Sequence, residues 1–85
     1  MHNFETAIEA QKIVRTLRDR LKSLKYNPDL KKMVDNLDFL VTELSKAEVV
    51  ARNNRTPGLI QKPREELAKA ITYADNMILL AALCQ

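Results

Sequence analysis

Apolar residues return every three or four positions from Leu30 to Ala51, and this spacing constrains the fold more than any other feature. Side chains at that spacing share one face of a helix for about six turns. The face consists of Leu30, Met33, Leu37, Leu40, Leu44, Ala47 and Ala51, with Val34 and Val41 beside it. We therefore predict an amphipathic helix over residues 28–52, which must bury its apolar face against another element.

A second amphipathic stretch precedes this one, in residues 3–26. Its apolar positions are Ala7, Ala10, Val14, Leu17, Leu21 and Leu24, and Phe4, Ile8 and Ile13 widen the same face. Asn3 is predicted to cap the start, with Glu5 in the first turn. The helix is predicted to end near Tyr26, because Pro28 disfavours a helical conformation in the residue before it and suits the start of a new helix. So short a turn predicts an antiparallel helical hairpin.

The periodicity fails over residues 52–63 and then resumes. The segment 56–59, Thr-Pro-Gly-Leu, is typical of a type II turn whose glycine needs a positive φ. Leu59 and Ile60 are expected to tuck under the bundle, and Pro63 is predicted to open a third helix that runs to residue 84. One stripe of this helix is Leu67, Ile71, Ala74, Ile78 and Ala81, and a second is Ala70, Tyr73, Met77, Leu80 and Cys84.

The composition favours an all-α fold. One Gly and three Pro among 85 residues supply too few tight turns for a small β-sandwich or barrel. A hydrophobic share of 46% predicts a chain that folds rather than a disordered one. Because a chain this short seldom forms two cores, we expect one helical domain over residues 1–85. Its predicted architecture is a three-helix antiparallel bundle, a long hairpin closed by the C-terminal helix, and it is expected to be oligomeric.

Few side chains are suited to catalysis or to binding a metal. The sequence has one histidine, His2, and one cysteine, Cys84, which excludes a disulfide within the chain and a Cys/His zinc site. Asp35 and Asp38 share a helix face, but that spacing is usual for a solvated surface. One glycine also excludes a glycine-rich phosphate loop. We therefore expect a protein that is not an enzyme and has no cofactor and no metal.

The net charge of +3 is concentrated in two basic groups. The first, here called the basic stripe, follows one side of the predicted first helix at spacings of three, four and three: Arg15, Arg18, Lys22 and Lys25. It could follow a phosphate backbone or an acidic protein groove, or it could be a solvated surface partly paired with Asp35 or Asp38. The second, here called the loop group, precedes the third helix: Arg55, Lys62 and Arg64. Free backbone N–H groups there could hold a phosphate, although Glu65 and Glu66 compete for that position.

Residues 77–84 are eight consecutive apolar positions, so a helix there is apolar on every side. A three-helix bundle covers about half of each helix, and something else should cover the remainder. A second copy of the chain, a foreign partner, or Phe39, Leu59 and Ile60 of the same chain are the three alternatives. The predicted oligomer interface consists of Met77, Leu79, Leu80 and Leu83.

The leading hypothesis is a small non-enzymatic interaction protein, of the adaptor, chaperone or inhibitor type. It would self-associate through the third helix and bind a macromolecular protein partner. The alternative is a nucleic-acid or nucleotide-phosphate binding protein that uses the basic stripe and the loop group. No apolar run reaches the roughly 20 residues of a membrane span, and charged residues occupy the place of a signal-peptide core. We therefore expect a cytoplasmic protein without a membrane span.

Overall fold

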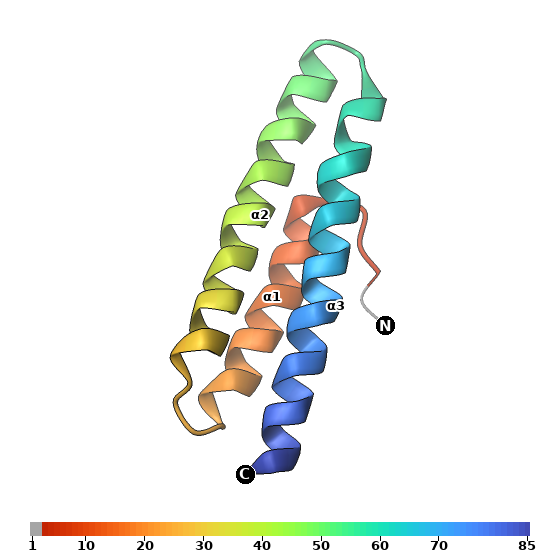
Figure 1. The fold of residues 1–85 in the computed structure, drawn as a ribbon. Helices are drawn as coiled ribbons and strands as arrows, with labels where there is room; N and C mark the ends of the chain where they lie inside the picture. Colours follow the sequence, from red (N-terminus) through yellow and green to blue (C-terminus); the bar gives the residue numbers. More distant parts are fainter. Residues whose placement is uncertain (1–2) are drawn as a thin grey trace.

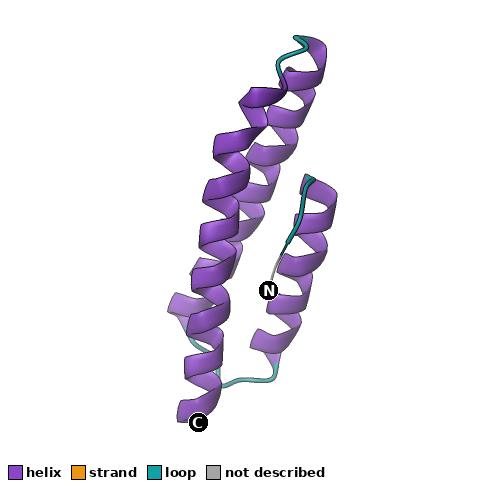
Figure 2. Cartoon of the chain, turned by 90° about the vertical axis from the view of Figure 1, so that its right-hand side faces the viewer, coloured by secondary structure: helices purple, strands orange, loops and turns teal. Residues whose placement is uncertain are grey.

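The computed structural model describes residues 3–85 as an all-α arrangement of three helices (Figure 1). Helix α1 spans Ala7–Lys22, α2 spans Pro28–Asn53 and α3 spans Gln61–Cys84. A short 3-10 helix, η1, spans Pro57–Ile60 and leads directly into α3. The described residues contain no strand, so the predicted fold class is confirmed. Because α1 is the shortest helix, it begins about halfway along the other two, and the remaining parts of α2 and α3 pair without it (Figures 1 and 2).

Helix α1 starts later than predicted, because Thr6 rather than Asn3 is its N-cap. The Thr6 hydroxyl accepts a hydrogen bond from the backbone N–H of Glu9 at 3.3 Å, and the Glu9 carboxylate accepts one from the Thr6 N–H at 3.2 Å. This reciprocal pair is a capping box. In addition, the Glu48 carboxylate of α2 accepts the N–H of Ala7 at 2.9 Å. The start of α1 is therefore fixed both locally and against α2.

Helix α1 also ends earlier than predicted, at Lys22 rather than near Tyr26. Ser23 accounts for the early end, because its backbone N–H and its hydroxyl both donate to the carbonyl of Arg20, at 3.2 and 2.7 Å. These contacts tighten the last turn and satisfy a terminal carbonyl that would otherwise lack a donor.

The start of α2 follows the prediction. Asn27 is the N-cap in an extended conformation, and its side-chain carbonyl accepts the N–H of Asp29 at 3.0 Å. Pro28 occupies the first helical position, where its missing N–H costs no intrahelical hydrogen bond. The short connection reverses the chain direction, and the predicted antiparallel hairpin of α1 and α2 is confirmed (Figure 1).

A left-handed residue, Arg55, follows the C-terminus of α2, and its φ is 53°. The N–H of Thr56 donates to the carbonyl of Ala51 at 2.8 Å, and the N–H of Arg55 donates to the carbonyl of Arg52 at 3.4 Å. These two bonds form a Schellman motif, in which the left-handed position is usually glycine. An arginine at this position carries a conformational cost that a glycine would not.

The predicted type II turn at residues 56–59 is wrong. Gly58 does not have a positive φ, and it lies within η1. The Schellman motif at Arg55 has already reversed the chain, so no further turn is required and Pro57 can start helical structure. As a result α3 begins at Gln61, and Pro63, predicted to be its first residue, lies within the first turn instead.

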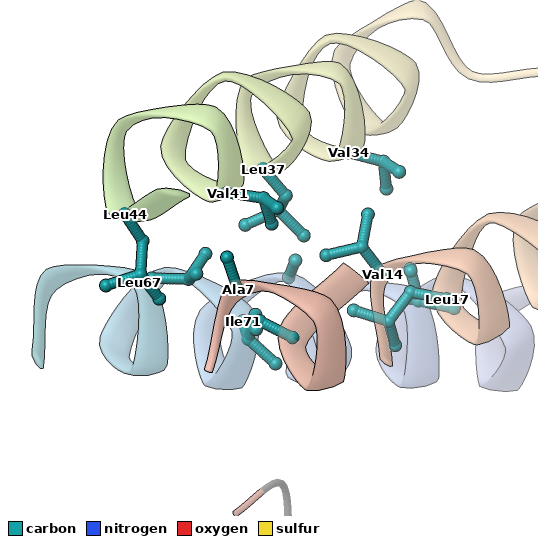
Figure 3. Packing of buried hydrophobic residues seen from close by; sticks show 12 residues of the cluster. Ala7, Val14, Leu17, Val34, Leu37, Val41, Leu44, Leu67 and Ile71 are labelled. Carbon is teal, nitrogen blue, oxygen red and sulfur yellow. The ribbon is translucent and has the colours of Figure 1, made fainter. Parts of the chain in front are cut away.

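The core is formed by one side of each helix (Figure 3). It consists of Ala7, Ala10, Val14 and Leu17 from α1, Val34, Leu37, Val41 and Leu44 from α2, and Leu67, Ile71, Ala74 and Ile78 from α3. Helix α2 is rotated relative to the prediction, since Val34 and Val41 are buried while Met33 and Leu40 are only partly buried. The reason is that α2 contacts both α1 and α3, so the middle of its apolar arc points between them. Ile8, predicted to widen the core face of α1, is exposed.

Candidate functional site

The second half of α3 turns large apolar side chains to solvent. We call this surface the α3 outer face; it consists of Tyr73, Asn76, Leu79, Leu80 and Leu83. The exposed fraction is 59% for Tyr73, 52% for Leu79, 55% for Leu80 and 75% for Leu83. Met77, the remaining residue of the predicted oligomer interface, is half-buried beside them. Three of the four predicted interface side chains therefore lie open on one surface.

The opposite side of the same helix explains why this surface is open. Ile71, Ala74 and Ile78 are buried in the core, so the inner side of α3 is already in contact with the other helices. The last turn of α3 also extends past the connection between α1 and α2 (Figures 1 and 2). A helix that is apolar on all sides can bury only one side in a three-helix arrangement.

The α3 outer face carries no formal charge. Residues 70–85 include a single charged side chain, Asp75. The Asp75 carboxylate pairs with the Arg20 guanidinium of α1, which places it on the side of α3 that faces α1. The ion pair therefore orients α3 within the fold, and it leaves the outer face wholly uncharged.

The residues that could have covered this face from within the chain lie elsewhere. Ile60 packs against the core cluster, and Leu59 is exposed in η1 before α3 begins. Phe39 borders a hollow of about 440 Å³ together with Pro63 and Glu66, near the first turns of α3. The single-chain alternative is therefore wrong, because none of the three reaches the α3 outer face.

The basic stripe is interrupted by an ion-pair network at Arg18. The Arg18 guanidinium donates to Asp35 at 3.0 Å and also to Asp38, both on α2. The hydrogen bond that Arg18 donates to Asp35 is the main cause that raises the pKa of Arg18. Arg18 therefore joins α1 to α2 across the hairpin, as the solvated-surface alternative predicts for it, and its charge is neutralised within the chain.

Asp35 lies at the centre of this network. It also accepts a hydrogen bond from Lys31 at 2.8 Å, one turn earlier on α2. The hydrogen bonds from Lys31 and then from Arg18 hold the pKa of Asp35 below its usual range. The hydrogen bond to Asp35 in turn raises the pKa of Lys31.

The other members of the basic stripe remain at the surface. Arg15 is exposed, and the Lys22 ammonium lies 3.8 Å from the Asp19 carboxylate. The backbone N–H of Lys25 donates to the side-chain carbonyl of Gln85 at 3.1 Å, while the Lys25 side chain is exposed. A hollow of about 330 Å³ beside the connection has no acidic lining residue; it is lined by Arg18, Leu21, Lys22, Leu24, Lys25, Tyr26, Asn27 and Lys31.

The loop group lies at and before the start of α3, since Lys62 and Arg64 are in its first turn and Arg55 precedes η1. Arg64 lies 3.9 Å from the Glu5 carboxylate, on the N-terminal segment, while Arg55 and Lys62 are exposed. Because η1 leads directly into α3, the backbone N–H of Gln61 already donates to the Gly58 carbonyl. One of the N–H groups at the predicted phosphate niche is therefore already used within the chain, and Pro63 has no N–H to offer.

No group of three or more His, Cys, Asp or Glu side chains within residues 3–85 is placed to hold a metal ion. Cys84 is a free, exposed thiol in the last turn of α3. His2, the one histidine of the sequence, lies outside the described residues.

One helical stretch has the length and composition of a membrane span. Pro57–Cys84 has 28 residues, and its most apolar window has a mean hydropathy of 1.4. Only 22% of that window is buried, whereas the core helix of a soluble protein would be mostly buried. The stretch has no uninterrupted apolar run of about 20 residues, but the mean hydropathy of this window is high because its few charged residues lie among many apolar ones. Length and composition alone do not establish a membrane span. Binding of the α3 outer face to a lipid surface is therefore one of the interactions to be tested.

Two residues of the α3 outer face, Tyr73 and Asn76, were not predicted as interface residues. Tyr73 belongs to the second apolar stripe predicted for the third helix, and Asn76 has no predicted role. The spacing of three, four and three from Tyr73 through Asn76 and Leu80 to Leu83 would have placed all of them on one line.

The functional assignment depends on this chain's own residues. No family model matches the chain, and comparison with curated proteins and with solved structures found no match.

Proposed function

We propose that this chain is a small non-enzymatic helical interaction protein that self-associates through the α3 outer face and binds a macromolecular partner. One observation carries the proposal: the four large apolar side chains exposed on one uncharged surface, Tyr73, Leu79, Leu80 and Leu83. An exposed apolar surface of this kind marks an interaction site more often than it remains bare. A second copy of the chain is the simplest cover, because it presents the same surface.

The energetic scale is consistent with a concentration-dependent assembly. Full burial of a leucine or aromatic side chain contributes about 1.5–3 kcal/mol, and each copy would bring several partly exposed ones. Association costs about 4–15 kcal/mol in lost freedom of motion and ordering. The free energy gained by burying these side chains is therefore of the same order as the free energy that association costs. We expect a reversible oligomer rather than an obligate one.

The exposed members of the basic stripe support binding of an acidic protein partner. Arg15, Lys22 and Lys25 remain at the surface, whereas Arg18 is held by two aspartates. A nucleic-acid binder of this size would need several charges free to neutralise phosphates. Since the central charge of the stripe is neutralised within the chain, we propose the protein partner and treat nucleic acid as an outcome of the test.

The test is size-exclusion chromatography with light scattering, recorded at 260 and 280 nm over a range of protein concentrations. We expect a mass that is a multiple of 9.7 kDa and no excess at 260 nm. Leu80→Asp and Leu83→Asp should each give the monomer mass, because a charge would be buried in the interface. Ile8→Asp is the matched control: Ile8 is an exposed apolar residue on α1, and its replacement should leave the oligomer intact.

Four outcomes would contradict the proposal. A wild-type monomer at all concentrations would remove self-association. An unchanged mass for both aspartate variants would place the interface elsewhere. A 260 nm excess that disappears with rising salt would favour the nucleic-acid alternative. Sedimentation of the wild type with lipid vesicles, lost in Leu83→Asp, would assign the α3 outer face to a membrane instead.

A further inference from the structure

Four residues of the α3 outer face lie on one line along the helix. Tyr73, Asn76, Leu80 and Leu83 follow each other at spacings of three, four and three, which is the spacing of the contact seam between two coiled helices. All four are exposed. We call this line the α3 seam; Asn76 is its single amide, and the Tyr73 hydroxyl is its other polar group.

We propose that two copies of the chain pack their α3 seams in parallel and in register, with Asn76 of each copy facing Asn76 of the other as the residue that fixes this register. The proposal rests on the self-association proposed above. It adds the orientation of the two copies and the residue that selects it.

The hydrogen-bonding capacity of Asn76 is the reason for the parallel arrangement. Within residues 3–85 the Asn76 side chain has no hydrogen-bond partner. In parallel pairing each seam residue meets its own counterpart, so the two amides can donate to and accept from each other. In antiparallel pairing centred on the seam, Asn76 would face Leu80, and its amide would be buried without a partner. A lone polar seam residue that selects register in this way is well established for coiled helices.

The residues around the seam favour a copy of the same chain over a charged partner. Met77, Leu79 and Cys84 flank the seam, and none of them carries a formal charge.

Lys69 continues the line one turn before Tyr73, and it is exposed. Parallel pairing would place two Lys69 ammonium groups opposite each other, and because like charges facing each other across an interface are unfavourable, the proposed contact begins at Tyr73.

Disulfide formation between single cysteines tests the register. One chain carries Leu83→Cys and the other Tyr73→Cys, both in a Cys84→Ser background, and one chain is labelled with ¹⁵N. A disulfide forms only when the two Cα atoms come within roughly 7 Å. After mixing and mild oxidation, mass spectrometry should find disulfides joining position 83 to 83 and position 73 to 73. Ile8→Cys in the same background measures the level of random collision.

The possible results separate the two proposals. A disulfide between positions 73 and 83 would overturn the parallel register while self-association stands. A dimer by light scattering that forms no disulfide above the collision level would also overturn the parallel register and leave self-association standing. A monomer by light scattering would overturn self-association and the register together. All of these substitutions are at exposed positions, and circular dichroism checks that each variant remains helical.

The role of Asn76 itself has a separate readout. In Asn76→Leu versions of both chains the seam no longer has an amide that would be buried without a partner, so both orientations can form. We expect the 73–83 disulfide to appear beside the other two and the dissociation constant to fall by about tenfold. Disulfides that still join only equal positions in Asn76→Leu would show that another residue sets the register.

Discussion

The two sides of α3 have similar residues and opposite surroundings. On the inner side, Ile71 and Ile78 are at most 1% exposed and lie in the core with residues of α1 and α2. On the outer side, Leu80 and Leu83 are more than half exposed although they are within two turns of Ile78. Equally apolar residues therefore stabilise the fold on the inner side of α3 and are exposed to solvent on its outer side.

This difference separates folding from association. The inner side has partners in the same chain, so its contribution to stability does not depend on protein concentration. The outer side gains a partner only when another molecule arrives, so its contribution follows mass action. The same comparison holds for charge, because Asp75 on the side facing α1 is paired while the outer face has no charged group at all.

The largest expected effect comes from removing a side chain of the inner side. Ile71→Ala should lower the free energy of unfolding by about 2–5 kcal/mol, because Ile71 is fully buried and a cavity would remain. Leu80→Ala should change it by at most about 0.5 kcal/mol when the protein is dilute enough to be monomeric. Urea unfolding followed by circular dichroism compares the two. An equal loss for Leu80→Ala would mean that Leu80 is buried within the monomer.

Much of the fold follows from local patterns in the sequence. The core residues of α1 and α3 lie on the predicted stripes, and Asn27 with Pro28 correctly marks the start of α2. These features depend on periodicity and on chemistry within a few residues. The rotation of α2 does not, because it depends on the positions of two other helices. The start of α1 similarly includes a contact from Glu48, which is 41 residues away in the sequence.

The candidate site was predictable in part. Leu79, Leu80 and Leu83 belong to an apolar run too long for one face of a helix, so their exposure follows from the sequence. The neutralisation of Arg18 was foreseen only as one of several alternatives, because charge spacing on one helix does not show which acids lie opposite. Pairing with Asp35 and Asp38 depends on the register between α1 and α2, which no local pattern determines.

The connection between α2 and α3 offers a way to raise folding stability without changing the α3 outer face. Arg55→Gly should raise the free energy of unfolding by about 1 kcal/mol, because a glycine adopts the left-handed φ of this position without steric cost. Gly58→Ala should raise it by about 0.5–1 kcal/mol, since Gly58 is helical and an added Cβ would meet no atom within 4 Å.

Neither variant should change the oligomer mass, because both positions precede α3 and lie far from its outer face. Thermal unfolding at a fixed protein concentration measures the gain, and light scattering measures the mass. A loss of stability in Gly58→Ala would indicate that position 58 does need a positive φ, as the type II turn required.

The smallest expected effect lies on the charged side of the molecule, at Asp35. Hydrogen bonds from Lys31 and then Arg18 lower the pKa of Asp35 from its usual value of 3.8. A carboxyl group whose pKa is lowered by folding stabilises the fold above the pKa of the unfolded chain. This contribution is lost as the pH falls through the lower pKa of the folded state. The exposed position of the group keeps the contribution small.

Asp35→Asn should therefore lower the melting temperature slightly at pH 7, and the difference from wild type should shrink as the pH falls below 3.8. It should vanish once Asp35 of the folded wild type is protonated, because the two proteins then carry the same charge at this position. Thermal melts of both proteins at one low concentration, from pH 7 downward, measure the difference. A difference that stays constant or grows with acid would mean that Asp35 acts through the shape of its side chain and not through its charge. The oligomer mass at pH 7 should be the same in both proteins, since the α3 outer face has no charged group for Asp35 to influence.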